Sequence, residues 1–258
     1  MAELHALIFD VDGTLANTER DGHRVAFNRA FAEAGLDWHW SVSLYGELLA
    51  VAGGKERIRF YLNHYRSDFP PTANLDRLSA DLHAAKTKHY QELLASGAIP
   101  LRPGVERLLK EARRQEVRLA IATTSALPNV TALLEKNLEP SWFELIAAGD
   151  IVPAKKPAPD IYHYVLEVME LQAQDCLVFE DSHHGLKASS QVGLKTVVTF
   201  NDYTKNQDFA DAILVVNNLG EPEQPFTVVS GDVGDVSYLD MSLVRRLHAG
   251  IRLGKTDE

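Results

Sequence analysis

Apolar and polar positions follow two patterns along this chain, and the first is an alternation of strands and helices. The short apolar run 6–9 stands beside a turn, which is typical of a strand buried on both faces of a parallel sheet. Similar strands are expected at 118–123, 145–149, 176–179, 195–200 and 212–216. Helices are expected between them, at 105–112, 127–138, 160–171 and 184–192. This alternation predicts a parallel sheet with helices on both faces.

The second pattern is helical throughout and separates the first strand from the others. Residues 15–22 are polar and rich in turn formers, so a connector is expected there, followed by a helix from His23. A second connector is expected at 96–104. Between the two connectors, helices are expected at 43–51, 55–65 and 75–94, with breaks at Gly53-Gly54 and Pro70-Pro71.

Together the two patterns predict an α/β fold with two domains. Residues 1–17 and 98–258 are expected to form a Rossmann-like three-layer core with a parallel sheet, and 18–97 an inserted α-helical cap domain. Near the C-terminus a strand at 226–230 and a short helix at 242–248 are expected, while the role of residues 218–258 stays open.

Polar side chains stand at the ends of three predicted strands, and the carboxyl ends of parallel strands meet at one edge of a sheet. These side chains are Asp10 and Asp12, Thr123 and Thr124, and Glu180 and Asp181. Ionised carboxylates are too costly to bury without a cation or hydrogen bonds. The pattern therefore places the six residues in a crevice where α/β folds bind ligands.

The spacing of Asp10 and Asp12 has a chemical interpretation. Residues two apart on a strand point to the same side, and Gly13 permits a sharp turn directly after them. One carboxylate can then attack an electrophile while the other transfers protons. These residues alone are equally consistent with an acidic turn that has no catalytic role.

Composition limits the class of protein. The chain has 258 residues and a net charge of −10, without a run of Lys and Arg, which argues against a nucleic-acid partner. The one cysteine, Cys176, cannot form an internal disulfide, which favours a reducing compartment. No signal peptide or membrane span is evident, so a cytoplasmic protein without membrane association is predicted.

Four motifs in order along the chain resemble the haloacid dehalogenase superfamily of phosphotransferases, in its subgroup with a helical cap. They are Asp10-x-Asp12-Gly13-Thr14, Ile121-Ala122-Thr123-Thr124, Lys155-Lys156-Pro157 and Phe179-Glu180-Asp181. The resemblance extends to about residue 216. Singly, each motif also has a structural interpretation, such as a plain strand end at Thr123 or a solvated loop lysine at Lys156.

The resemblance implies a role for each motif. Asp10 is expected to attack phosphorus and form an aspartyl-phosphate, and Asp12 to act as acid and then base. Thr123 would hold phosphate oxygens, and the positive charge of Lys156 would reduce repulsion between phosphate and nucleophile. The implied cofactor is Mg²⁺, which prefers oxygen ligands. Its expected ligands are Asp10, the Asp12 carbonyl and Asp181, with Glu180 as a ligand or a neighbour.

Within this superfamily the chain resembles the CbbY proteins, which implies hydrolysis of the 1-phosphate of xylulose-1,5-bisphosphate. The likeness lies in cap residues such as Trp38 and Trp40 and in the Thr123–Ser125 stretch. The expected substrate-binding residues are Glu19, His23, Tyr45, Gly54, Lys55, Arg57, Thr124 and Ser125. Lys55, beside a glycine pair, is the expected partner of the second phosphate. Packing of Tyr45, helix capping by His23, and a solvated face with Lys55 and Arg57 are the corresponding structural interpretations.

Three other functions are considered. A β-phosphoglucomutase carries a lysine after its strand-end hydroxyl motif, whereas this chain has Ser125-Ala126-Leu127. A general sugar-phosphate or phosphoglycolate phosphatase is a second alternative. A non-catalytic binding module is disfavoured because Asp10, Asp12 and Asp181 are all present. The expected partner is a small sugar phosphate or bisphosphate, and the expected state is a monomer.

Overall fold

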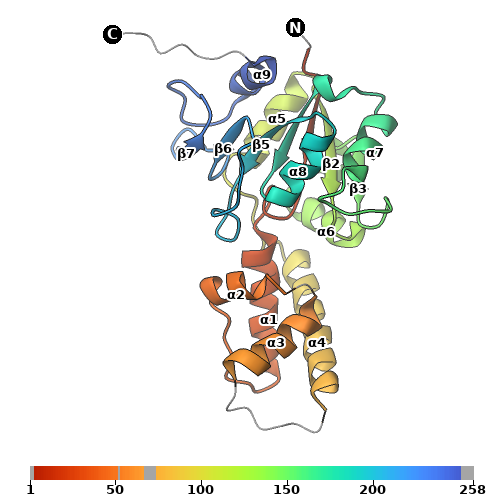
Figure 1. Ribbon diagram of the computed structural model, residues 1–258, viewed down its shortest axis with the longest axis vertical. Helices are drawn as coiled ribbons and strands as arrows, with labels where there is room; N and C mark the ends of the chain where they lie inside the picture. The colour runs from red at the N-terminus through yellow and green to blue at the C-terminus, as the bar shows by residue number, and fades with distance from the viewer. Residues whose placement is uncertain (1–2, 52, 67–73, 251–258) are drawn as a thin grey trace. The chain divides into compact units, whose positions relative to one another are not determined.

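The computed structural model describes residues 3–51, 53–66 and 74–250 (Figure 1). The chain separates into two compact units: an α/β unit of Met1–Asn17 and Pro100–Glu258, and a helical unit of Thr18–Ile99. The second boundary lies two residues beyond the expected one. The break expected at Pro70-Pro71 lies outside the described residues.

The α/β unit is organised around one sheet, whose order is β3-β2-β1-β4-β5-β6-β7. Strands β1 to β6 pair in parallel, and β7 pairs with β6 in antiparallel fashion. Their bounds are Ala6–Phe9, Arg118–Thr123, Leu145–Ala148, Cys176–Glu180, Lys195–Thr199, Leu214–Val216 and Val228–Ser230. The predicted α/β fold is confirmed, and the sheet is parallel as predicted except at β7.

Strand β1 occupies the point at which the strand order reverses. Phe9 lies opposite Ile121 of β2 on one side and Phe179 of β4 on the other. Successive strands continue outward from β1 in both directions, so the loops that leave β1 and β4 diverge above the sheet. Ligands of open α/β sheets bind in the crevice at such a switch point.

Helices cover both faces of this sheet. They are α5 (Val105–Arg114), α6 (Leu127–Asn137), α7 (Asp160–Val168), α8 (His183–Gln191) and α9 (Met241–Ala249). Right-handed crossovers place α5 and α6 on one face and α7 and α8 on the other, and Figure 1 shows α8 in front of the sheet with α5 behind it. Under α7 and α8, Ile8 and Val178 pack with Ile161 and Val165. Cys176 is buried in the same cluster, where burial raises the pKa of its thiol to about 12.

Two segments of the α/β unit, one on each side of the helical insertion, pair with each other. Ala16 forms an antiparallel bridge with Leu101, and the Arg102 N–H donates to the Leu15 carbonyl at 2.8 Å. The Arg102 side chain is buried and donates to the carbonyl oxygens of Gly13, Thr199, Phe200 and Asn217. One guanidinium thus connects the loop after β1 to the ends of β5 and β6.

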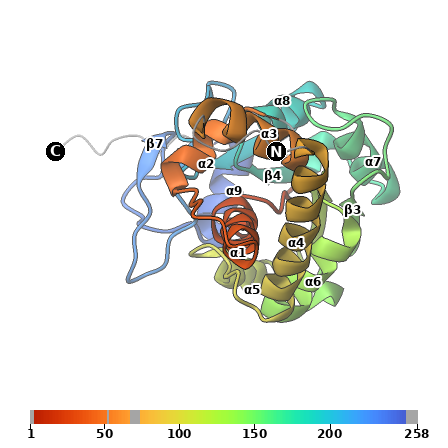
Figure 2. The same ribbon diagram turned by 90° about the horizontal axis from the view of Figure 1, so that it is seen from below.

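The helical unit contains α1 (Arg24–Glu33), α2 (Val42–Leu48), α3 (Gly54–Tyr65) and α4 (Leu75–Ala95). Helices α1 and α4 lie side by side (Figure 2). The aromatic side chains buried in this unit include Phe27, Phe31, Trp38, Trp40 and Tyr61. Tilted and edge-to-face contacts join these five rings within its core.

The first helical segment begins earlier than expected. Residues Thr18–His23 form a wide helical turn that continues into α1, where a polar connector was expected. The reason is close packing: a Cβ on Gly22 would come within 2.7 Å of Tyr90 and of Ile99. Packing against α4 therefore outweighs the turn-forming composition of this stretch. No helix in the described part of the chain is long and apolar enough to cross a membrane.

Candidate active site

Asp10 stands directly after β1, at the centre of the sheet edge. Its N–H donates to the Phe179 carbonyl at 3.0 Å, so its backbone continues the pairing of β1 with β4. The side chain is buried. Burial raises the pKa of Asp10, and the charges of Glu180, Asp181 and Asp12 raise it further, against the opposing effect of Lys156. A carboxylate in this position remains ionised only with strong cationic support.

Lys156 supplies part of that support. Its Nζ donates to Asp10 Oδ1 at 2.8 Å, to Glu180 Oε1 at 2.6 Å and to the Ala122 carbonyl at 2.8 Å. These three bonds engage every proton of the ammonium group. Burial lowers the pKa of Lys156, but the charges of Asp10 and Glu180 outweigh this and leave the pKa well above its usual range. Lys156 is therefore a fixed positive charge beside the candidate nucleophile.

Glu180, at the end of β4, is held on several sides. Its Oε1 also accepts a hydrogen bond from the Tyr162 hydroxyl at 2.5 Å. Burial raises the pKa of Tyr162, and the charge of Glu180 adds to the effect, so the phenol stays a donor. Gly185 in α8 leaves the space that the carboxylate occupies, since a Cβ there would overlap the Glu180 side chain. The carboxylate has little freedom to move.

Asp181 completes a group of three buried carboxylates with Asp10 and Glu180, whose oxygens lie within 4.8 Å of one another. Burial and the charge of Glu180 raise the pKa of Asp181 to about 7, while Arg102 and a 2.7 Å hydrogen bond from Asn201 oppose the shift. The set is rich in oxygen ligands and in negative charge. These properties fit a hard divalent cation such as Mg²⁺.

Asp12 faces the hydroxyl residues at the end of β2. Its Oδ2 accepts hydrogen bonds from the Ser125 hydroxyl and, at 3.5 Å, from the Thr123 hydroxyl. Gly13, which directly follows Asp12, has a φ of +90°, and a Cβ at this position would overlap the Asp181 carboxylate. The sharp turn predicted at Gly13 is therefore present, and it brings the loop after β1 against the end of β4. Thr124 lies half-buried beside this group.

The helical unit brings together three of its predicted site residues. The hydroxyl of Tyr45 donates to Glu19 Oε2 at 2.6 Å and accepts from Arg57 Nη1 at 2.9 Å. Tyr45 itself is fully buried. The phenol therefore joins the Glu19 carboxylate to the Arg57 guanidinium, although the two residues are 38 positions apart in the sequence.

The other three residues predicted for this unit have different surroundings. His23 Nδ1 lies 2.8 Å from Lys86 Nζ. Gly54 lies against the imidazole of His83, which a Cβ would approach to 2.5 Å. Lys55 is exposed.

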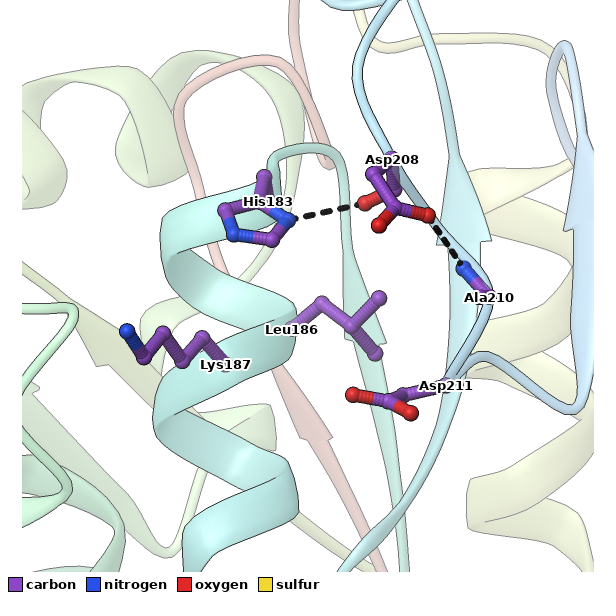
Figure 3. Close-up of a pocket in the computed structure, with 6 residues that line it drawn as sticks. All are labelled: His183, Leu186, Lys187, Asp208, Ala210 and Asp211. Carbon is purple, nitrogen blue, oxygen red and sulfur yellow. Dashed lines mark hydrogen bonds between the residues drawn. The ribbon is translucent and has the colours of Figure 1, made fainter.

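A separate surface pocket of about 240 Å³ lies beside α8 and does not contain the acidic group. His183 Nδ1 donates to the Asp208 carbonyl at 2.9 Å, while Lys187 points away from Asp211 (Figure 3). The ionisable side chains around this pocket do not converge on a common point. The chemistry of the α/β unit is therefore concentrated at the switch point and not in this pocket.

Comparison with known proteins shows to which family this chain belongs. A model of hydrolases, described as haloacid dehalogenase-like hydrolase, matches residues 4–193. The chain belongs to the haloacid dehalogenase-like hydrolases. The predicted membership and the predicted enzyme class, a phosphatase of this family, are confirmed.

Several members of this family are close relatives over most of their length. Protein CbbY (plasmid) of Cupriavidus necator is 43% identical over 257 residues, which are 98% of this chain and all of the relative. Protein CbbY of Rhodobacter capsulatus is 48% identical over 81% of this chain and 91% of its own length.

Two solved structures of CbbY from Rhodobacter sphaeroides are also similar. One is a complex with phosphate, with 44% identity, a TM-score of 0.66, and coverage of 83% of this chain and 94% of that one. The other is a mutant in complex with xylulose-1,5-bisphosphate, with 43% identity and the same TM-score and coverage.

Four residues of this haloacid dehalogenase-like site were not expected from the sequence: Tyr162, Gly185, Asn201 and Arg102. The spacing of 160–171 favours a buried face with Tyr164 and Val168, yet Val168 is 50% exposed and Tyr162 is fully buried. A buried face at 161, 162, 165 and 169 fits the same helix. That choice of face would have identified Tyr162 as a candidate site residue. Asn201 stands just after an expected strand end, which is a weak signal. Gly185 and Arg102 have no local signal.

Proposed function

We propose that this haloacid dehalogenase-like enzyme is a Mg²⁺-dependent phosphatase that removes the 1-phosphate of xylulose-1,5-bisphosphate. The observation that supports it most is the arrangement of Asp10 between Lys156 and a carboxylate group, with Asp12 against two hydroxyls. The relative from R. sphaeroides, 43% identical, is described in complex with xylulose-1,5-bisphosphate. Identity of this level over most of the chain favours the same substrate here.

In the first proposed step, a carboxylate oxygen of Asp10 attacks phosphorus. The bond between phosphorus and the sugar oxygen breaks, and Asp12 donates its proton to that oxygen. Lys156 holds Asp10 in position, and its positive charge reduces repulsion between the carboxylate and the phosphate. We assign the binding of phosphate oxygens to the hydroxyls of Thr123 and Ser125, which contact Asp12.

In the second step, Asp12 takes a proton from water, and the water oxygen attacks phosphorus. The bond to Asp10 breaks, and phosphate leaves with the Asp10 carboxylate restored and Asp12 protonated again, as it was before the first step. The residues proposed to hold Mg²⁺ are Asp10, Asp181 and the Asp12 carbonyl, with Glu180 nearby. When bound, the ion neutralises negative charge on the transferring phosphoryl group. Glu180 is held by Lys156 and Tyr162, so its main effect is to fix Lys156 beside Asp10.

The residues proposed to contact the sugar come from the helical unit: Glu19, His23, Tyr45, Gly54, Lys55 and Arg57. Hydrogen bonding of Tyr45 to Glu19 and Arg57 supports a fixed arrangement of these polar groups. Closure of the helical insert over bound substrate would exclude water during the first step.

A phosphate-release assay tests the proposal. Xylulose-1,5-bisphosphate, ribulose-1,5-bisphosphate, glucose-1-phosphate and p-nitrophenyl phosphate are compared with the purified protein. We expect the highest kcat/KM for xylulose-1,5-bisphosphate, complete loss of turnover in EDTA, and recovery with Mg²⁺. Asp10→Asn should lower turnover by roughly 10⁴- to 10⁶-fold, the scale at which a covalent nucleophile is lost. Preference for glucose-1-phosphate would refute the substrate, and full activity in EDTA would refute the metal.

A further inference from the structure

Asp181, one of the three buried carboxylates, is held by an amide from the loop that follows β5. Nδ2 of Asn201 donates to Oδ2 of Asp181 at 2.7 Å. A hydrogen bond to one carboxylate oxygen restricts rotation of the whole group, so it also sets the direction of the other oxygen. This contact therefore determines how the Asp181 carboxylate faces the rest of the acidic group.

The loop itself fixes which end of the Asn201 amide meets the carboxylate. Oδ1 of Asn201 accepts from the Tyr203 N–H at 2.9 Å, so the amide nitrogen is the end that faces Asp181. The main chain of Asn201 is held as well, because its N–H donates to Thr204 Oγ1 at 3.0 Å and its carbonyl accepts from the Thr204 N–H at 3.2 Å. Thr204 is buried. Asn201 thus presents a donor to Asp181 from a fixed position.

The contact between Asn201 and Asp181 lies against the loop that follows β1. A Cβ on Gly13 would come within 2.1 Å of Asp181 Oδ2 and 2.6 Å of Asn201 Nδ2, so the glycine leaves space for this hydrogen bond. One buried guanidinium holds both sides of the contact. Arg102 donates to the Gly13 carbonyl and, at 2.7 Å, to the carbonyl of Phe200, the residue before Asn201. The hydrogen bond is therefore enclosed by two loops that one side chain ties together.

We propose that Asn201 is a positioning residue, which orients Asp181 to bind a divalent cation together with Asp10. The inference rests on the proposed function, in which these carboxylates hold Mg²⁺. A ligand that is oriented in advance loses less freedom when the ion binds, so the affinity for the ion is higher. Partners that orient a metal ligand typically contribute about 10- to 100-fold to metal affinity. A neutral amide also suits this position because a cationic side chain would compete with the ion for the charge of Asp181.

Substitution of Asn201 by serine separates the two contacts of this side chain. A serine hydroxyl can still accept from the Tyr203 N–H, as hydroxyls do in turns, but the side chain ends too early to reach Asp181. Asn218→Ser is the matched control, because Oδ1 of Asn218 accepts from the Gly220 N–H at 2.7 Å in the same kind of turn. Within the described ranges, the amide of Asn218 makes no hydrogen bond to a carboxylate.

Binding of Mg²⁺ to the metal-free protein is the first readout, measured by calorimetry without substrate. We expect Asn201→Ser to raise Kd for Mg²⁺ by about 10- to 100-fold, and Asn218→Ser to leave it within about twofold. Urea unfolding in EDTA, followed by circular dichroism, checks that both variants are folded. Asn201→Thr also keeps a hydroxyl and carries the same expectation, so it replaces the serine variant if that variant is unstable.

The dependence of turnover on Mg²⁺ concentration is the second readout, and it separates orientation of Asp181 from a general structural effect. In Asn201→Ser, the Mg²⁺ concentration for half-maximal hydrolysis of p-nitrophenyl phosphate should rise by about 10- to 100-fold. Saturating Mg²⁺ should then restore kcat to within about threefold of the wild-type value. A lower kcat that saturating Mg²⁺ does not restore, with an unchanged Kd for Mg²⁺, would refute the positioning role.

The outcomes distinguish this inference from the proposed function. If the wild-type protein binds Mg²⁺ and is activated by it, but Asn201→Ser changes neither Kd nor the half-maximal concentration, only the role of Asn201 is refuted. An equal loss of Mg²⁺ affinity in Asn201→Ser and Asn218→Ser would also refute it, because the loss would then follow from the turns and not from the bond to Asp181. If the wild-type protein neither binds nor requires Mg²⁺, the proposed metal and the role of Asn201 are both overturned.

Discussion

Replacement of Lys156 by methionine should destabilise the α/β unit strongly, quite apart from its effect on catalysis. Lys156 is 7% exposed, and the two carboxylates it bridges, Asp10 and Glu180, are 10% and 1% exposed. Removal of one partner from a buried ion pair costs about 3–5 kcal/mol, because the remaining charge stays buried without compensation. In Lys156→Met two such charges remain, those of Asp10 and Glu180.

Protonation limits this cost. A stranded carboxylate can take up a proton at pH 7, and lifting its pKa from an ordinary value near 4 to pH 7 costs about 4 kcal/mol per group. With one or both carboxylates stranded, the expected loss of unfolding free energy is therefore about 4–8 kcal/mol at pH 7 in metal-free buffer. The raised pKa of a stranded carboxylate in the folded variant also sets how the free energy of unfolding depends on pH. Relative to the wild-type protein, the variant should regain about 1.4 kcal/mol per bound proton for each pH unit between 7 and 5.

Urea unfolding followed by circular dichroism measures this difference, with EDTA present and at several pH values. The control is Lys155→Met, because the neighbouring lysine pairs with Asp150 at 2.9 Å while the two side chains are 52% and 89% exposed. That variant should lose less than about 1 kcal/mol. Addition of Glu180→Gln to Lys156→Met should recover part of the loss, since one stranded charge is removed. A loss at position 156 no larger than the loss at 155 would refute the charge-compensation argument.

Three further outcomes are expected. Asp12→Asn should slow turnover by about 10²- to 10⁴-fold, with partial rescue of the first step for a leaving group that needs no proton; equal losses for all leaving groups would argue against proton transfer. Gly185→Ala should lower kcat by about 10²-fold, because the new Cβ displaces the Glu180 carboxylate; unchanged kcat would show that this carboxylate can move freely. The third outcome concerns His248, which is buried with Nε2 donating to the Gln174 carbonyl at 2.7 Å, and whose pKa is lowered, first by burial. The unfolded chain then binds the proton more readily, so stability should fall as pH drops below about 6.5, and less so in His248→Gln; urea unfolding at pH 7.5 and 5.5 would detect the difference.

The sheet and the polar side chains at its edge were predictable because both depend on local patterns. Each strand is a short apolar run, and a parallel sheet brings the residues that follow the runs to one edge. The positions of Asp10, Thr123 and Glu180 after such runs are therefore enough to predict that they share this edge. Lys156 was expected through its motif, although spacing alone does not show that its ammonium group reaches Asp10.

The supporting residues were not predictable because their contacts join distant parts of the chain through atoms that leave no pattern. Arg102 binds carbonyl oxygens that lie 89 to 115 residues away, and any residue supplies a carbonyl. Lys86 lies in a long polar helix whose spacing resembles that of a solvated surface. It becomes half-buried only because α4 packs against α1, and helical periodicity does not specify which helices pack together.

The pairing of Ala16 with Leu101 has a consequence for how this family can diversify. The chain leaves the sheet after Ala16 and returns at Leu101, and a backbone bridge together with the bond from Arg102 to Leu15 holds these two positions together. A segment inserted between adjacent, anchored chain positions adds little closure entropy and requires no change in the sheet. A shorter loop, or a different insert with its own set of charged side chains, can therefore be joined at the same two positions. Such an exchange would alter which phosphate ester is accepted while the residues of the reacting centre stay as they are.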